Sequence, residues 1–196
     1  MKKKLFIIML IVTMGSLLCF SDTSGSEINI SKIGEWGTGI YRDVFVKNSY
    51  AYIAAGGNGL DIIDINNPSN PSIIGNQNLD SETKAVYVSG NYAFVACVNG
   101  LHIVDVTVPT APRVVGFYAI TAYTDSFHGI SPTATGVTVE GNYAFLAIIF
   151  GKYNSLTIDI IDVTDPTKPK ATGASIQSGE DYSFYRLPLQ KNGNKF

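Results

Sequence analysis

The sequence predicts an all-β protein built from three four-stranded antiparallel repeats. Two blocks of sequence each occur three times along the 196-residue chain, always in the same order. Both blocks alternate in side-chain character with a period of two, which indicates strands. Nineteen Gly, eleven Tyr and ten Phe residues suit many short strands joined by tight turns.

The first repeated block is a strand that runs into a proline-containing corner. In each copy an Asp is followed after four residues by a Pro, after three more by a second Pro, and after four more by a Gly. Gaps this regular indicate one structural unit used repeatedly. The copies are LDIIDINNPSNPSIIG, LHIVDVTVPTAPRVVG and IDIIDVTDPTKPKATG, at Leu60–Gly75, Leu101–Gly116 and Ile158–Gly173.

The second block lies upstream of the first and predicts a hairpin. It begins at Val44, Val86 and Val137, so the intervals are 42 and 51 residues. Each copy has a short strand, a turn with Gly or Asn, which tolerate positive φ, and then a Tyr-Ala-aromatic strand. The period of two places both aromatic rings on one face and Ala on the other. Each unit is therefore predicted to hold four strands, A to D, with the units at about 43–84, 85–135 and 136–178.

The Asp at each corner is predicted to be structural. Asp64, Asp105 and Asp162 end strand C, where a short carboxylate can accept backbone N–H groups of the following turn. The prolines lack an N–H and hold the preceding residue extended, so the corner is rigid. A proline-rich recognition ligand and a catalytic carboxylate set are both disfavoured, because these residues recur once in every unit.

Four antiparallel strands in about forty residues are typical of a β-propeller blade. The strands LDIID, LHIVD and IDIID, followed by the spaced prolines and Gly, resemble the LVIVD repeat family of bacterial and archaeal surface proteins. The resemblance covers roughly Ile30 to Ser175. It implies a propeller fold, a cell-surface location and no agreed enzymatic activity or cofactor. The chain departs from the family in having only three repeats and a stretched third one.

Three blades predict an incomplete ring, because propellers usually close with four to eight. The segment Ser31–Gly37 matches the end of a D strand, whereas residues 176–196 show no further repeat. We therefore expect residues 27–196 to form a partial propeller and the chain to be a fragment or truncated product. Unpaired strand edges at Ser31–Gly37 and near the C-terminus predict self-association.

The first 26 residues predict a secretory signal peptide. Three lysines at positions 2–4 precede an apolar run from Leu5 to Phe20, and a small polar stretch follows. The run is shorter than the roughly twenty residues of a spanning helix. An uncleaved anchor and lipidation at Cys19 are the alternatives, although Leu18 is larger than the residue expected before a lipidated Cys. The protein is thus predicted to be secreted or at the cell surface, with membrane contact only through the signal or an anchor.

Composition excludes some function classes. Cleavage after Ser26 removes three Lys and one Asp, which leaves 14 − 3 = 11 basic and 16 − 1 = 15 acidic residues, a net charge of −4. Such a balance offers no basic face for nucleic acid. Cys97 is then the only Cys, so no intrachain disulfide can form.

Two insertions predict a binding face. One lies between strand D of the second unit and strand A of the third, and the other between strands B and C of the third unit. In an antiparallel blade these connections leave from the same end, and loops on a rigid scaffold commonly carry function. The candidate binding residues are Tyr123, Asp125, Phe127, His128, Phe150, Lys152 and Tyr153.

The function predicted is a non-enzymatic binding scaffold with an unknown protein or glycan partner at the cell surface. Asp125 and His128 could form an acid/base pair, so a propeller hydrolase or lyase with its site on the same loops is the alternative. Two His residues give no zinc-ligand spacing, so no metal is expected. His102 replaces an Asp of strand C and is predicted to lie at the surface.

Overall fold

The computed structural model describes residues 40–120, 132–150 and 155–178. Apart from the short 3-10 helix η1 (Gly56–Asn58), its regular structure is β-strand. The strands are β1 (Asp43–Lys47), β2 (Tyr50–Ala54), β3 (Leu60–Asp64), β4 (Ser72–Gln77), β5 (Thr83–Ser89), β6 (Tyr92–Cys97), β7 (Gly100–Asp105), β8 (Arg113–Ala119), β9 (Thr133–Glu140), β10 (Tyr143–Phe150), β11 (Ser155–Asp162) and β12 (Lys170–Ser178).

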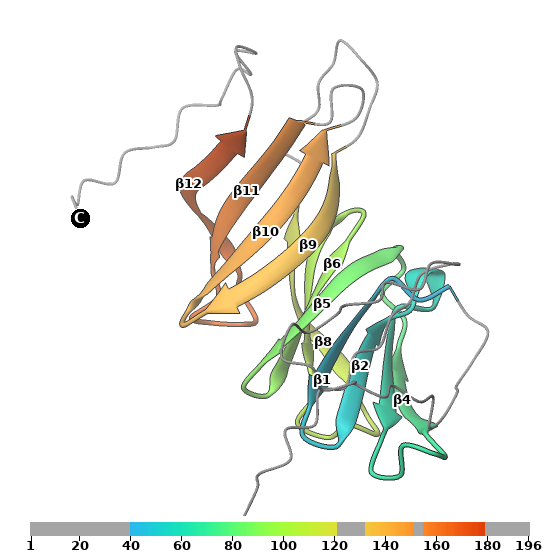
Figure 1. Ribbon diagram of the computed structural model, residues 1–196. Coiled ribbons are helices and arrows are strands. Elements are labelled where there is room, and N and C mark those ends of the chain that lie inside the picture. The colour runs from blue at the N-terminus through green and yellow to red at the C-terminus, as the bar shows by residue number, and fades with distance from the viewer. Residues whose placement is uncertain (1–39, 121–131, 151–154, 179–196) are drawn as a thin grey trace, which may run out of the picture.

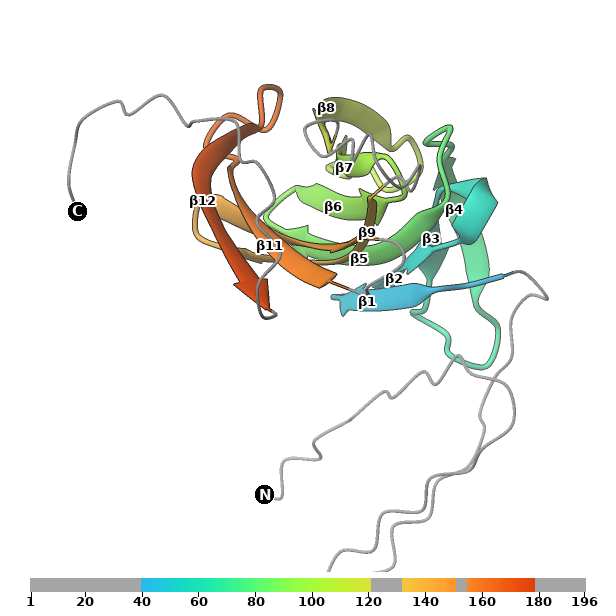
Figure 2. The ribbon, with the colours of Figure 1, turned by 90° about the horizontal axis from the view of Figure 1, so that it is seen from above.

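These strands form three four-stranded antiparallel sheets, which confirms the predicted fold class. The first sheet is β1–β4, the second β5–β8 and the third β9–β12, each in sequential order (Figure 1). Seen from above, the first strands β1, β5 and β9 gather toward the centre, and the last strands β4, β8 and β12 lie at the periphery (Figure 2). The described sheets fan out like propeller blades and do not close into a ring.

The predicted A–B hairpins are present in all three sheets. The pairs Lys47↔Tyr50, Ser89↔Tyr92 and Glu140↔Tyr143 leave turns of two residues. The first turn residue has positive φ in each: +56° at Asn48, +56° at Gly90 and +55° at Gly141. Asn and Gly are the residues that adopt this conformation at least cost, which explains their place in the repeat.

The connections divide the sheets into two ends. The A–B turns and C–D corners share one end, which we call the corner end. There the residue after strand C donates its N–H to the A–B turn of its own sheet, in Ile65→Ser49, Val106→Asn91 and Val163→Asn142, at 2.8–2.9 Å. The B–C and D–A connections share the other end, which we call the loop end.

Each sheet has an aromatic face and an aliphatic face. The aromatic faces carry Phe45, Tyr50, Tyr52, Leu60 and Ile62 in the first sheet, Tyr87, Tyr92, Phe94, Leu101 and Ile103 in the second, and Tyr143, Phe145, Ile158 and Ile160 in the third. The aliphatic faces carry Val44, Val46, Ala51, Ile53 and Ile63, then Val86, Val88, Ala93, Val95 and Val104, then Val137, Val139, Ala144, Leu146 and Ile161.

The core lies between neighbouring sheets. The aromatic face of the first sheet packs on the aliphatic face of the second, and the aromatic face of the second packs on the aliphatic face of the third. Leu60, Ile62, Leu101, Ile103 and Leu146 are fully buried in these two junctions. Each side chain of this kind contributes roughly 1.5–3 kcal/mol on burial, so the junctions hold the fan together.

The glycines that end the first two motifs have a role at the same junctions. A Cβ atom on Gly75 would lie 2.1 Å from the carbonyl oxygen of Pro109, and one on Gly116 would lie 2.0 Å from that of Pro166. Both distances are far below van der Waals contact. The glycine therefore accommodates the proline corner of the next sheet, a role that the sequence pattern alone did not reveal.

Candidate functional site

The loop end is where the sequence predicted a binding face. Its described connections are Ala55–Gly59 between β2 and β3, Asn78–Glu82 between β4 and β5, and Val98–Asn99 between β6 and β7. They are short and differ in sequence from sheet to sheet. Backbone hydrogen bonds tie them together, from Val98 N–H to Glu82 C=O at 3.0 Å and from Ile120 N–H to Asn99 C=O at 3.2 Å.

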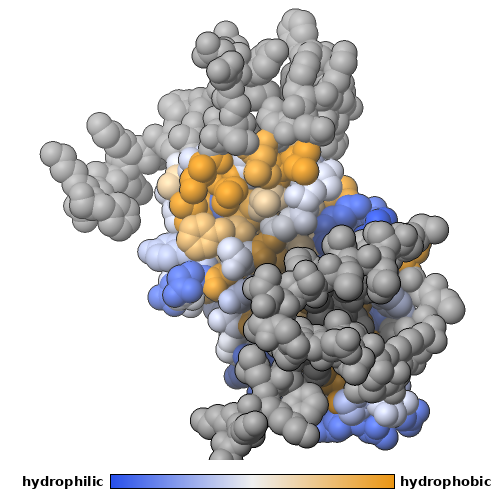
Figure 3. All heavy atoms as spheres, in the orientation of Figure 1, coloured by the Kyte–Doolittle hydropathy of each residue, from blue (hydrophilic) through white to orange (hydrophobic). Residues whose placement is uncertain are grey.

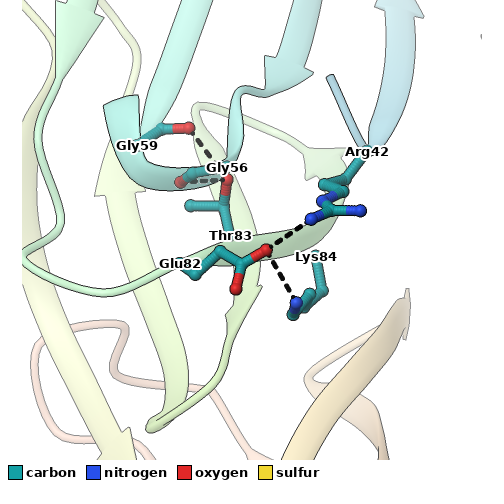
Figure 4. Close-up of polar contacts among 6 residues, drawn as sticks. All are labelled: Arg42, Gly56, Gly59, Glu82, Thr83 and Lys84. Atoms are coloured by element: carbon teal, nitrogen blue, oxygen red, sulfur yellow. Dashed lines mark hydrogen bonds and ion pairs between the residues drawn. The ribbon is translucent and has the colours of Figure 1, made fainter. Parts of the chain in front are cut away.

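Thr83 fixes this end of the first junction. Its side chain is fully buried at the start of β5, and its hydroxyl lies 3.1 Å from the Gly56 carbonyl oxygen and 3.0 Å from that of Gly59 (Figure 4). A hydroxyl has one hydrogen, so it donates to one of these oxygens at a time. The contact anchors the β2–β3 loop of the first sheet to the second sheet.

A charged cluster lies beside Thr83. Oε1 of Glu82 accepts hydrogen bonds from Arg42 and Lys84, each at 2.8 Å (Figure 4). The bond from Lys84, followed by that from Arg42, holds the pKa of Glu82 below its usual value. All three side chains remain accessible to water, so solvent screens their interaction. The cluster places one negative and two positive side chains at the loop end of the first junction.

His102 is buried, so the prediction that it lies at the surface is wrong. It is 9% exposed, and its Nε2 lies 3.2 Å from Oδ1 of Asn99. Its ring contacts that of Phe117 in a tilted arrangement, with centroids 4.4 Å apart and an angle of 40° between the ring planes. The second position of strand C is on the aliphatic face, which the first sheet covers. Among the described residues, Nδ1 of His102 has no hydrogen-bond partner. Burial lowers the pKa of this imidazole, while the nearby Asp80 carboxylate opposes that effect.

The other two sheets also bury a polar side chain at this position. In the first sheet Asp61 accepts a 2.7 Å hydrogen bond from the Asn76 side chain. In the third sheet Asp159 accepts one at 3.1 Å from the Tyr118 hydroxyl, which belongs to the second sheet. The signal for these residues was the recurrence of Asp, His and Asp at one strand position. The pattern showed the polar position but not that it is buried.

The Asp residues of the corner end accept hydrogen bonds from their turns. Oδ1 of Asp64 accepts the Asn66 N–H at 2.8 Å, that of Asp105 accepts the Thr107 N–H, and that of Asp162 accepts the Thr164 N–H, both at 2.9 Å. The hydrogen bonds from the two threonines lower the pKa of Asp105 and Asp162. This geometry suits the scaffold role predicted for the three carboxylates.

Six of the predicted binding residues, Tyr123, Asp125, Phe127, His128, Lys152 and Tyr153, lie outside the described residues. Phe150 is the last residue of β10, is partly buried, and packs against the core between the second and third sheets. The insertions depart from the ends of β8 and β10 and rejoin the chain at β9 and β11. The pairs Ile149↔Thr133 and Phe150↔Ser155 place three of these four strand ends together at the loop end.

Other reactive groups of the described chain are buried or dispersed. Burial raises the pKa of the Cys97 thiol to about 12, so it stays protonated and is a poor nucleophile. Within residues 40–120, 132–150 and 155–178, no three His, Cys, Asp or Glu side chains lie close enough to hold a metal ion. Over the same ranges, no helix has the length and apolarity needed to cross a membrane.

The fan of four-stranded sheets, joined through alternating faces and proline corners, defines a propeller-type repeat protein. The LVIVD repeat matches residues 38–78, 81–120 and 133–174, so the chain belongs to the LVIVD repeat family. No curated protein matches the chain. Among solved structures, the crystal structure of the computationally designed Ika8 protein is similar at 9% identity and a TM-score of 0.41. The similarity covers 69% of this chain and 48% of the Ika8 chain.

Proposed function

We propose that this protein is an exported, non-enzymatic scaffold that binds a protein or glycan partner at the cell surface through its loop end. The observation that carries the proposal is the contrast between the two ends. The corner end repeats the same hydrogen bonds in all three sheets. The loop end differs in every sheet and receives both insertions of the chain. Variable loops on a repeated scaffold are the usual place for recognition.

The residue types of the insertions suit a contact surface. Tyr123, Phe127 and Tyr153 supply large rings, and Asp125, His128 and Lys152 supply polar groups. Protein interfaces are enriched in aromatic residues, and a small number of polar groups then fixes orientation. Phe150 connects this surface to the scaffold, because it ends β10 and packs on the core between the second and third sheets.

Three carboxylates of the described residues support a scaffold role. Asp105 and Asp162 accept hydrogen bonds from their own turns, and Glu82 is paired with two cations. A general acid or base needs a pKa near the working pH. The pKa of each of these groups is lowered instead, which keeps it ionised and bonded at neutral pH.

Export can be tested directly by expressing the full chain in its host and sequencing the N-terminus of the recovered protein. We expect the mature chain outside the cytoplasm, beginning between Ser21 and Glu27. Recovery of intact Met1 from the cytosol would refute the export part of the proposal.

Binding can be tested with the fluorescently labelled full chain on host cells that lack the gene. We expect the parent protein to bind saturably and the double variant Tyr123→Ala/Tyr153→Ala to bind at least about tenfold more weakly, since truncating aromatic anchors is costly. Gly141→Asn is the matched control at the corner end, because Asn48 has the same φ at the equivalent turn position. Protease treatment of the cells separates a protein partner from a glycan. Equal binding by all three proteins, or none by the parent, would overturn the proposal.

A further inference from the structure

The aromatic faces of the first two sheets are covered by the sheets that follow them. Leu60 and Ile62 pack in the first junction, and Leu101 and Ile103 pack in the second. The third sheet has an aromatic face of the same kind, and within residues 40–120, 132–150 and 155–178 no sheet follows it. Its aromatic face is therefore the one that lacks a neighbouring sheet in this part of the chain.

Apolar side chains on this face are exposed. Tyr143 is 43% exposed, and Ile176 is 58% exposed. The equivalent residues of the second sheet, Tyr92 and Tyr118, pack against the core of the second junction. Figure 3 shows apolar side chains gathered over the β9–β12 sheet on the face turned toward the viewer. Apolar side chains gathered on one exposed face are typical of an interaction site.

One row of paired residues crosses the aromatic face of the third sheet at its corner end and has opposite charges at its two ends. From β12 to β9 this row is Lys170, Asp162, Tyr143 and Glu140. Lys170 and Glu140 are both exposed, and neither forms an ion pair with another described residue. Three interstrand spacings, roughly 14 Å, separate them, so they cannot pair with each other within one chain.

This arrangement of charge is confined to the third of the three sheets. The equivalent row ends in Lys47 and Ser72 in the first sheet, and in Ser89 and Arg113 in the second. Each of these rows has a cation at one end and a serine at the other. Both sheets nevertheless pack on the sheet that follows, so opposite charges are not needed for packing within the chain.

A second row of the same face has large residues on one side and small residues on the other. From β12 to β9 it is Ile176, Ile158, Ala147 and Gly136. A Cβ atom on Gly136 would lie 3.5 Å from that of Ala147, so these two residues share the face. The equivalent row of the second sheet has a similar order of sizes and packs on the third sheet. The charges, and not the shape alone, therefore identify the partner.

We propose that the aromatic face of the third sheet binds the same face of a second copy of this chain, about a two-fold axis parallel to the strands. Rotation about this axis lays β12 of one copy over β9 of the other, with corner end over corner end. Lys170 of each copy then lies opposite Glu140 of the other, so two ion pairs form. The large side of the second row faces the small side of its counterpart. Two sheets packed face to face with nearly aligned strands form a β-sandwich, and such a contact closes at two copies.

The same rotation places Tyr143 of each copy opposite Asp162 of the other. The chain already uses such a pair between two sheets, since the Tyr118 hydroxyl donates to Asp159 across the second junction at 3.1 Å. Oδ1 of Asp162 accepts the Thr164 N–H, and a carboxylate has a second oxygen with which to accept. A tyrosine hydroxyl covered by an interface usually finds a hydrogen-bond partner, and Asp162 supplies one.

The experiment measures the mass of the purified full chain over a range of concentrations by light scattering and analytical ultracentrifugation. Ile176→Asp places a charge on the apolar part of the face, and Lys170→Glu and Glu140→Lys each reverse one charge at its edge. Arg113→Glu is the matched control, because Arg113 holds the place of Lys170 in the second sheet and its side chain is 75% exposed. Circular dichroism melts verify that every variant is folded.

We expect the parent and Arg113→Glu to be dimers. Ile176→Asp should raise the dissociation constant about 100-fold or more, because it introduces a charge into an apolar contact. Each charge reversal should raise it about tenfold or more, since like charges then meet twice in every dimer. The double variant Lys170→Glu/Glu140→Lys is the decisive protein. It restores both ion pairs between copies, so it should dimerise as tightly as the parent.

Each other outcome overturns the proposal. A monomeric parent would mean that the third sheet does not bind a second copy, and oligomers of more than two copies would exclude a two-fold contact. Loss of dimer in Ile176→Asp without an effect of either charge reversal would indicate an axis across the strands, which places Lys170 opposite Ser178. A double variant as weak as the single reversals would mean that the two charges do not meet. Association unchanged in every face variant would point to strand-edge pairing, and equal weakening by Arg113→Glu would point to net charge.

Discussion

The two ends of the sheets follow different rules. At the corner end, Asn70, Ala111 and Lys168 each donate a 2.9 Å hydrogen bond to the residue three positions earlier, and the Asp of each corner accepts an N–H two residues ahead. At the loop end, a threonine hydroxyl, a buried histidine and a charged cluster hold different connections. Identical hydrogen bonds repeated in every sheet indicate that the corner end builds the fold. The loop end, whose contacts differ from sheet to sheet, is free to vary in sequence.

Gly116→Ala should give the largest effect, because it tests the corner end at a sheet junction. The added Cβ would lie 2.0 Å from the carbonyl oxygen of Pro166, and both atoms belong to ordered backbone. The third sheet must then shift away from the second. We expect a loss of roughly 3 kcal/mol in the free energy of unfolding, at the upper end for overpacking.

Gly57→Ala is the matched control at the loop end. An added Cβ there meets nothing within 4 Å, and its φ lies outside the left-handed region. We expect a change within about 0.5 kcal/mol. Chemical denaturation of both variants decides the comparison. Equal losses in the two would mean that the corner end is no more constrained than the loop end.

Asp105→Ala tests the turn bonds of the corner end at a smaller scale. It removes the acceptor of the Thr107 N–H and hydroxyl, at 2.9 and 2.6 Å. Because water can reach this turn and replace the acceptor, we expect a loss of only about 1 kcal/mol. Asp105→Asn keeps a side-chain oxygen at the same position, so this variant should recover most of the stability that Asp105→Ala loses. If Asn is as destabilising as Ala, the charge pair with Arg113 matters more than the turn.

The pH dependence of stability tests the loop end, because His102 is a titratable group buried there whose pKa is shifted. Its folded pKa is lowered, chiefly by burial, so the unfolded chain binds a proton more readily than the folded one. The contribution of neutral His102 to the free energy of unfolding is therefore fully present above its ordinary pKa of 6.5. It is lost as the pH falls from 6.5 through the lower pKa of the folded state. We expect a modest effect, because Asp80 offsets part of the shift.

The measurement is the free energy of unfolding of the parent and of His102→Gln between pH 8 and pH 5. Gln cannot be protonated, so the difference between the two proteins should change over this range as the parent loses stability. Parallel pH curves would show that His102 has the same pKa in the folded and unfolded chains.

The sequence predicted the parts of the molecule that depend on local pattern. Strand order, the hairpin turns at Asn48, Gly90 and Gly141, and the fold class follow from periodicity and turn chemistry, which act within one unit. Burial of His102 depends on a neighbouring sheet, as does the contact between Gly116 and Pro166. The pattern within one repeat does not show which residues of the adjacent sheet lie against it, so these features could not be derived from the sequence. The predicted loop residues stay a prediction, apart from the placement of Phe150.

Glu82→Gln should give the smallest effect and tests the loop end at its surface. The variant removes the charge that accepts from Arg42 and Lys84, yet both cations remain in water, and Thr83 still ties the two sheets together beneath them. Exposed ion pairs contribute little because solvent screens them, so we expect a loss of at most about 0.5 kcal/mol. The loss should vanish near 1 M salt, where the Debye length falls to roughly 3 Å. Urea denaturation at low and high salt measures both values. A loss as large as that of Gly116→Ala would mean that charge, and not the buried hydroxyl, joins the first two sheets at this end.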